Sequence, residues 1–99
     1  MVNSSKISKA MSDKNRLKIM EMLSVGQRNV SSVAENLNVE ENLASHHLRV
    51  LASLGFLKSD KKGREVFYSI NKKRLVTLIK DLKKNPIFRE ILEEALTEK

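Results

Sequence analysis

The segment from Glu40 to Leu51 combines an apolar stripe with side chains that can recognise another molecule. Ala44, Leu48 and Leu51 recur at spacings of four and three, which predicts a helix with one face buried in a core. On a DNA base edge, arginine can form two hydrogen bonds to guanine, asparagine two to adenine, and glutamate can accept one from cytosine. The outward-facing candidates for such contacts are Glu41, Asn42, Ser45, His46 and Arg49. The alternative interpretation is the solvated face of an ordinary helix.

A second group of candidate contacts is the basic run Lys61, Lys62, Gly63 and Arg64, which we interpret as a hairpin turn because glycine permits positive φ. Its cationic side chains suit contact with phosphates or entry into a minor groove. A charged turn that keeps an edge hairpin soluble is the alternative. We favour the DNA interpretation because the run follows a predicted helix-turn-helix. Ser31, near the start of that motif, joins the candidate DNA contacts.

Other chemistries find little support in the sequence. His46 and His47 are adjacent, so on a helix they point about 100° apart and cannot hold one metal ion together. We expect His47 to face the core with a backbone hydrogen-bond partner. Cysteine is absent, which excludes disulfides, thiolate metal sites and thiol redox switches. No nucleophile, base and orienting group stand at an interpretable spacing, so we expect no enzyme, no metal site and no cofactor.

The composition favours a polyanionic partner. The chain has 19 Lys and Arg against 12 Asp and Glu, a formal net charge of +7. No apolar run approaches the roughly 18 residues of a spanning helix, and the N-terminus lacks the apolar core of a secretion signal. We therefore expect a cytoplasmic protein that binds double-stranded DNA and no membrane.

The chain before and after the predicted helix over 40–51 supplies the elements that must position it. A short helix over 4–11 is followed by a second helix, capped by Ser12 or Asp13, with an apolar stripe continuing to Val25 and ended by Gly26. Asn29 or Ser31 can cap a third helix. The brief turn at residues 38–39 then joins this third helix to the helix that begins at Glu40, which makes a helix-turn-helix over 29–54. Alternating residues over 56–70 predict a two-stranded hairpin, or wing.

The two ends of the chain carry more apolar surface than so small a fold needs. Asn71 can cap a late helix, and a final helix follows Pro86. We assign this surplus to a homodimer interface formed by the first and late helices. The residues assigned to dimerisation are Ile7, Met11, Leu75, Leu78, Ile79 and Leu82.

The expected fold class is therefore mainly α, an α+β winged helix-turn-helix with a two-stranded β-hairpin wing and extra terminal helices for dimerisation. We expect a single domain over 1–99. Its parts are an N-terminal dimerisation helix over 1–11, the helix-turn-helix over 29–54, the wing over 56–70 and C-terminal helices over 72–98.

The sequence resembles the ArsR/SmtB-type winged-helix repressors. The resemblance runs from about residue 12 to residue 70. It rests on Asp13–Leu23, Val33-Ala34-Glu35-Asn36-Leu37, Ser45-His46-His47-Leu48-Arg49-Val50-Leu51, Gly55 and Gly63-Arg64 with Tyr68. It implies a homodimeric DNA-binding transcriptional regulator, usually a repressor, which pairs through its first and late helices.

The departures from the family pattern concern metal sensing. Members with a Cys-x-Cys pair would carry it at Asn29 and Ser31, and neither residue supplies a thiolate. Members with a late-helix zinc site use two histidines and two acidic residues, and the best corresponding positions here are Lys72, Arg74, Asn85 and Phe88. The resemblance thus implies a regulator that does not respond to metal through the usual sites.

Two hypotheses follow from the sequence. The first is a homodimeric, sequence-specific DNA-binding regulator, and the alternative is a winged-helix protein-protein interaction module within a larger assembly. The acidic start of the polar helix, at Glu40 and Glu41, favours the alternative because carboxylates repel phosphate. The sequence leaves open the operator, the target genes, the effector and the choice between repressor and activator.

Overall fold

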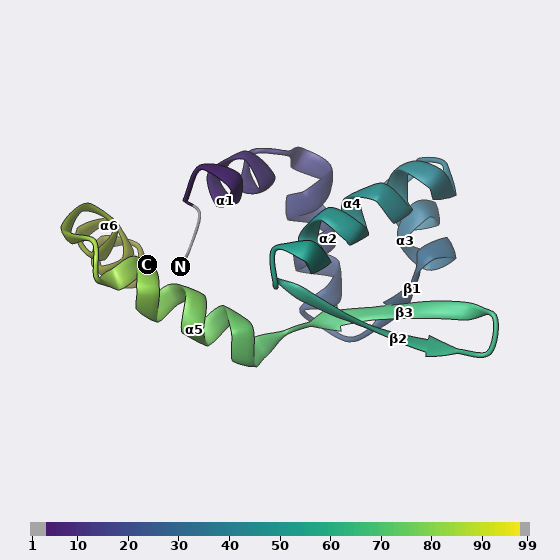
Figure 1. Ribbon diagram of the computed structural model, residues 1–99. Coiled ribbons are helices and arrows are strands. Elements are labelled where there is room, and N and C mark those ends of the chain that lie inside the picture. The colour runs from purple at the N-terminus through teal and green to yellow at the C-terminus, as the bar shows by residue number, and fades with distance from the viewer. Residues whose placement is uncertain (1–3, 98–99) are drawn as a thin grey trace.

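The structure is a computed structural model that describes residues 4–97, apart from the side chains of residues 4, 7, 8, 11, 92 and 95–97 (Figure 1). Its helices and strands follow the chain as α1 (Ser4–Met11), α2 (Lys14–Leu23), β1 (Arg28–Asn29), α3 (Val30–Leu37), α4 (Glu41–Ser53), β2 (Leu57–Lys62), β3 (Glu65–Ile70), α5 (Lys72–Lys83) and α6 (Pro86–Thr97). The winged helix-turn-helix fold predicted from the sequence is confirmed. The ends of the predicted domain, residues 1–3 and 98–99, lie outside the described residues.

The sheet has three strands rather than the predicted two. β1 pairs antiparallel with β3, which also pairs with β2, so the strand order is β1-β3-β2. The third strand is only Arg28–Asn29, paired with Tyr68 and Phe67. Two residues are too few for an alternating pattern, so this strand could not be predicted from the sequence.

The hairpin turn is tighter than predicted. Lys61 and Lys62 belong to β2, and Lys62 pairs with Glu65, so only Gly63 and Arg64 form the turn. Gly63 has φ 65° at the first central position, which is the place that a type II′ hairpin turn reserves for glycine.

The core lies where α2, α3 and α4 meet one face of the sheet. Its fully buried side chains include Ile19 of α2, Val33 of α3, Leu48 and Leu51 of α4, and Phe56, which directly precedes β2. The predicted apolar stripe of α2 is only partly correct, because the helix ends at Leu23 and Val25, to which the stripe was expected to continue, is exposed.

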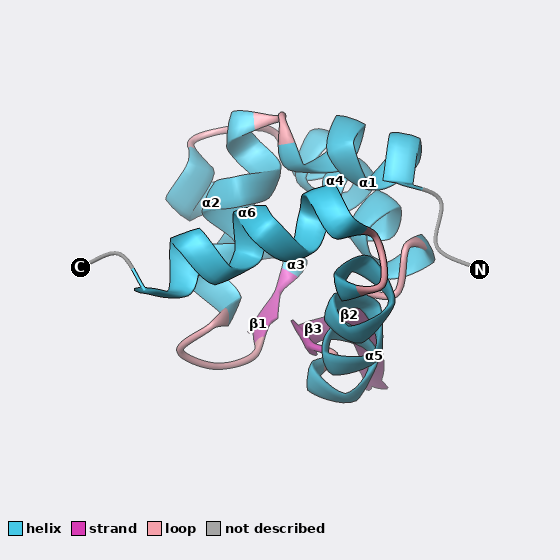
Figure 2. Cartoon of the chain, turned by 90° about the vertical axis from the view of Figure 1, so that its left-hand side faces the viewer, coloured by secondary structure: helices cyan, strands magenta, loops and turns pink. Residues whose placement is uncertain are grey.

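The last two helices reach beyond the sheet, while Leu78 of α5 remains part of the core. α5 runs outward from the base of the sheet, and α6 crosses it at a steep angle (Figures 1 and 2). Asn85 begins α6 by accepting a hydrogen bond from the backbone N–H of Ile87 at 3.0 Å. Pro86 suits the first turn of this helix, where its missing N–H would have no helical partner.

Candidate nucleic-acid interface

The angle between α3 and α4 is set by the turn at Asn38. Asn38 adopts the left-handed conformation at φ 57°, which asparagine tolerates better than most residues. The backbone N–H of Val39 donates to the carbonyl of Ala34 at 3.0 Å, and that of Asn38 donates to Glu35 at 3.1 Å. These paired bonds are the Schellman arrangement, which satisfies the last carbonyls of α3 and reverses the chain for α4.

α4 has the two faces that its sequence predicts. Ala44, Leu48 and Leu51 are fully buried, and the helix packs against α2, α3 and β2. The side chains of Glu41, Asn42, His46 and Arg49 are exposed, whereas Ser45 is half-buried. Neither Asn42 nor Arg49 makes a side-chain hydrogen bond or ion pair with another described residue, so both are available to a ligand.

His47 faces inward, as predicted, but its partner is a side chain rather than the backbone. It is 5% exposed and is the only buried polar side chain among the described residues. The Nε of Arg16, on α2, donates to Nδ1 of His47 across 3.2 Å. This bond requires Nδ1 to be unprotonated, and it joins α4 to α2 beside the core.

The charges around this pair shift two pKa values. Burial lowers the pKa of the His47 imidazole below its ordinary value of 6.5; nearby Asp13 opposes the shift, while Arg16 and His46 add to it. For Asp13, burial favours a higher pKa, but backbone hydrogen bonds from Arg16 and Asn15, with the nearby cationic groups, leave the pKa below 3.8. Asp13 also begins α2, since its carboxylate accepts those bonds as the N-cap.

Three of the predicted contact residues meet at one small cleft. Ser31 of α3, Glu41 of α4 and Arg64 of the wing turn line a space of about 180 Å³ where the three elements converge. The Ser31 hydroxyl donates to Oε1 of Glu41 at 2.7 Å, so this carboxylate is held against α3. The sequence had predicted each residue separately, and the fold brings these three together.

The two lysines of the wing lie on opposite faces of the hairpin because neighbouring strand residues alternate. Lys61 pairs with Val66, whereas Lys62 pairs with Glu65 and places its ammonium 5.1 Å from the centre of the Phe67 ring. This cation–π contact orients Lys62 along the hairpin. Lys61, Lys62 and Arg64 are all exposed.

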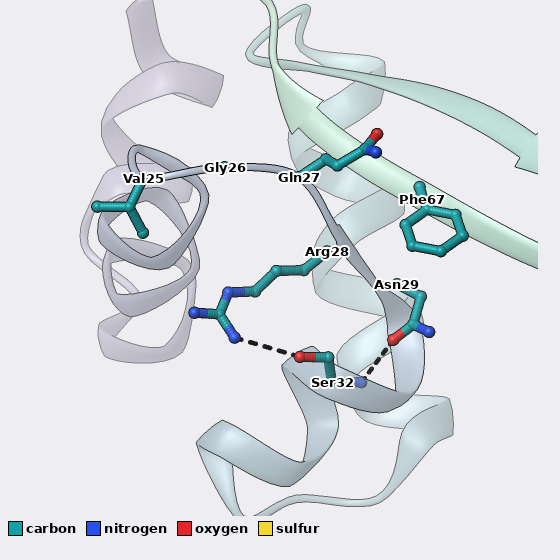
Figure 3. Close-up of a pocket in the computed structure, with 7 residues that line it drawn as sticks. All are labelled: Val25, Gly26, Gln27, Arg28, Asn29, Ser32 and Phe67. Atoms are coloured by element: carbon teal, nitrogen blue, oxygen red, sulfur yellow. Dashed lines mark hydrogen bonds between the residues drawn. The ribbon is translucent and has the colours of Figure 1, made fainter.

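Sequence reasoning predicted Asn29 as a cap of α3 but missed the other polar contacts that anchor the start of this helix. Asn29 caps the helix by accepting from the backbone N–H of Ser32 at 2.8 Å, and Arg28 donates to the Ser32 hydroxyl at 3.2 Å (Figure 3). The side-chain amide of Asn29 also donates to Glu65 at 2.9 Å, which ties α3 to the wing. A contact across 36 residues leaves no local signal, so only the capping role of Asn29 was predictable.

The residues assigned to dimerisation differ in exposure. Leu78 is buried within one chain, and Leu75 and Leu82 pack against the core, whereas Ile79 is 43% exposed. The side chains of Ile7 and Met11 lie outside the described residues. Further exposed apolar side chains on the two C-terminal helices are Val76, Ile87 and Ile91.

The described residues form neither a metal site nor a membrane-spanning helix. Among residues 4–97 with described side chains, no three histidine or acidic groups lie together where they could hold a metal ion. Over the same part of the chain, no helix has the length and apolar character needed to cross a membrane.

A helix-turn-helix with an exposed polar face, beside a basic β-hairpin, defines the class of winged-helix regulatory proteins. Residues 13–59 match the family described as "Bacterial regulatory protein, arsR family". The chain belongs to this family, since it is 34% identical over 65 residues to the transcriptional repressor SdpR of Bacillus subtilis (strain 168), covering 66% of this chain and 72% of the relative.

A second relative agrees with this assignment, and a solved structure shares the fold. The cadmium resistance transcriptional regulatory protein CadC homolog of Staphylococcus aureus is 40% identical over 75 residues, which are 75% of this chain and 62% of the relative. The fold is similar to the homodimeric winged helix-turn-helix DNA-binding domain of a possible ArsR-family regulator from Mycobacterium bovis, with a TM-score of 0.68 and 24% identity. That similarity covers 93% of this chain and 77% of the other.

Proposed function

We propose that the protein is a homodimeric, sequence-specific DNA-binding transcriptional regulator that acts as a repressor. Each subunit inserts α4 into a major groove, and the wing contacts phosphates or an adjacent minor groove. The observation that carries this proposal is the exposed face of α4, where Asn42 and Arg49 have no partner among the described residues. These two side chains suit adenine and guanine edges.

The proposed partner copy and the proposed repression rest on the relatives. The matched relatives include named repressors, and a structural neighbour is described as a homodimer. A dimer would carry about +14, twice the charge of one chain, which favours long-range attraction to DNA. Repression would follow if the bound dimer occludes a promoter.

We further propose that metal is not the signal at the sites common in the family. The positions that best correspond to those sites carry side chains that are cationic, amide, hydroxyl or aromatic, namely Asn29, Ser31, Lys72, Arg74, Asn85 and Phe88. Cationic and aromatic groups do not ligate divalent metals, and none of the six is a thiolate, histidine or carboxylate.

The test of this proposal is a selection from a random duplex library, followed by anisotropy titrations with the selected duplex and a scrambled one. We expect the selected duplex to bind tighter, and Arg49→Ala to weaken its binding by about 1–3 kcal/mol. The matched control is Arg89→Ala, which removes an exposed arginine of α6 and should leave affinity unchanged. Equal affinity for both duplexes, with a tight protein partner in a pull-down, would instead favour the interaction-module hypothesis.

A further inference from the structure

A hollow of about 310 Å³ lies between α1, α2 and the C-terminal end of α4. The wing turn lies at the far end of the hairpin from α1 and from the C-terminal end of α4 (Figure 1). Its size falls at the small end of the range typical of ligand pockets, roughly 300–1,000 Å³. None of the residues that line the hollow also lines the cleft formed by Ser31, Glu41 and Arg64, so the two are separate.

The lining of this hollow combines cations with an apolar wall. Lys6 and Lys9 of α1 and Arg16 of α2 contribute positive charge, and none of the lining residues is acidic, although Asp13 lies near Arg16 outside the lining. The apolar wall is formed by Ala10, which is buried, with Val50 and Leu54 of α4, which are half-buried. Three cations beside an apolar wall are complementary to a small amphipathic anion.

Arg16 connects the hollow to α4. Its Nε donates to His47, whereas its terminal nitrogens make no hydrogen bond to the described residues. A guanidinium presents five N–H donors in a fixed fork, so one edge can serve His47 while another binds a carboxylate or phosphate. An anion in the hollow would thus lie one side chain away from the buried histidine of α4.

We propose that this hollow binds a small organic anion, a carboxylate or phosphate group on a short apolar body, through Lys9 and Arg16. Binding neutralises part of the positive field of each subunit and engages the terminal nitrogens of the guanidinium whose Nε holds His47. The anion therefore weakens the binding of DNA. This second step rests on the proposed function, whereas the binding site itself does not.

Calorimetric titration of the full chain without DNA tests the site. The probes are octanoate, octyl phosphate and neutral octanol, so that the two head groups and the apolar body are separated. We expect saturable binding of an anion, one per chain, and no saturable binding of octanol. Whichever of octanoate and octyl phosphate binds more tightly identifies the head group.

Variants locate the bound anion. Lys9→Gln and Arg16→Met should each weaken anion binding about tenfold, because a hydrogen bond to a charged group is lost. Lys18→Gln removes an exposed charge from α2 outside the hollow and should bind like the parent chain. Circular dichroism and thermal melts show whether each variant is folded, and Lys9→Gln changes only an exposed side chain.

Several results would overturn the proposal. Absence of saturable binding by both anions would mean that the cations only stabilise the C-terminal end of α4. Equal weakening by Lys18→Gln and Lys9→Gln would mean diffuse charge attraction rather than a site. If an anion binds as expected, it should lower affinity for the selected duplex at least about fivefold. Unchanged DNA affinity would refute the regulatory step alone, and a chain that binds no DNA would refute the proposed function but not the site.

Discussion

His47 shows how one buried side chain can position the helix that we propose enters DNA. Its neighbours on α4, His46 and Arg49, point to solvent, whereas its own ring is held by Arg16 on a different helix. The sequence predicted that His47 faces inward from the position of the apolar stripe. It could not identify Arg16 as the partner, because the contact spans 31 residues.

Stability should fall as the pH drops below about 6.5, the ordinary pKa of histidine. Burial lowers the pKa of His47 in the folded chain, so the unfolded chain takes up the proton first. The stabilisation is therefore complete above the unfolded pKa and is lost as the pH falls towards the folded value, with a slope of at most about 1.4 kcal/mol per pH unit. Urea denaturation at a series of pH values measures this.

The matched variant for that experiment is His47→Asn. Its side-chain oxygen can still accept from Arg16, but it does not titrate, so the loss of stability in this pH range should become smaller. The lowered pKa of Asp13 contributes stability that is lost only as the pH falls below its ordinary value of 3.8, so it does not affect the change assigned to His47. An identical pH profile for the parent and the variant would contradict the assignment to His47.

Glu41 makes a second prediction at this scale. Its carboxylate is held by Ser31 at the start of α4, where DNA phosphates would approach. Glu41→Gln keeps an acceptor for Ser31 and removes the repulsion, so affinity for scrambled DNA should rise by about 0.5–1 kcal/mol at low salt. Glu90→Gln on α6 is the control, and the two can be compared by anisotropy. A decrease for Glu41→Gln would show that the carboxylate itself contacts the duplex.

At the scale of elements, the sequence was sufficient to predict where a helix begins when a residue at that end caps it. Asp13, Asn29 and Asn71 each accept a backbone hydrogen bond at the start of a helix, and all three were among the predicted caps. Gly55 follows the C-cap of α4 and has φ 89°, a conformation that glycine adopts readily. β1 was missed because it depends on β3 rather than on a pattern of its own.

The junction between α4 and α5 depends on Gly55 and Arg74. A Cβ at Gly55 would lie 2.6 Å from Cγ of Arg74 as well as requiring the left-handed backbone. Gly55→Ala should therefore destabilise the fold by about 1–2 kcal/mol or more. In an Arg74→Ala background the steric part should disappear and only the backbone part remain. Urea denaturation of the parent chain, the two single variants and the double variant measures this coupling. Strictly additive changes in the free energy of unfolding would contradict the close approach of Gly55 and Arg74.

At the scale of the whole molecule, one chain is elongated. Its extents are 44 × 24 × 23 Å and its radius of gyration is 14.4 Å, against about 13 Å for a compact domain of roughly 100 residues. α5 and α6 account for the elongation, and they expose Val76, Ile79, Ile87 and Ile91. The sequence predicted surplus apolar surface here, but it could not separate Leu78, which is buried, from Ile79, which is not.

That difference gives a prediction about the proposed dimer. Ile79→Asp should convert the dimer to a folded monomer, because it places a charge in an exposed apolar surface that we assign to the interface. Leu78→Asp should instead unfold the chain, because it buries an unpaired charge. Thr77→Asp, at an exposed polar position of α5, should change neither property. Sedimentation velocity and circular dichroism measure them, and a parent chain that is already monomeric would refute the dimer.

The most direct test attaches a DNA-cleaving iron chelate to α4 through the single cysteine of Asn42→Cys. Because the parent chain has no cysteine, the chelate is attached at this position alone. On the selected duplex, we predict cleavage at two places about one helical turn, or a multiple of it, apart. The same reagent on Glu90→Cys of α6 should give only background cleavage. Equal, scattered cleavage from the two positions would contradict the claim that a pair of α4 helices lies in the grooves of one duplex.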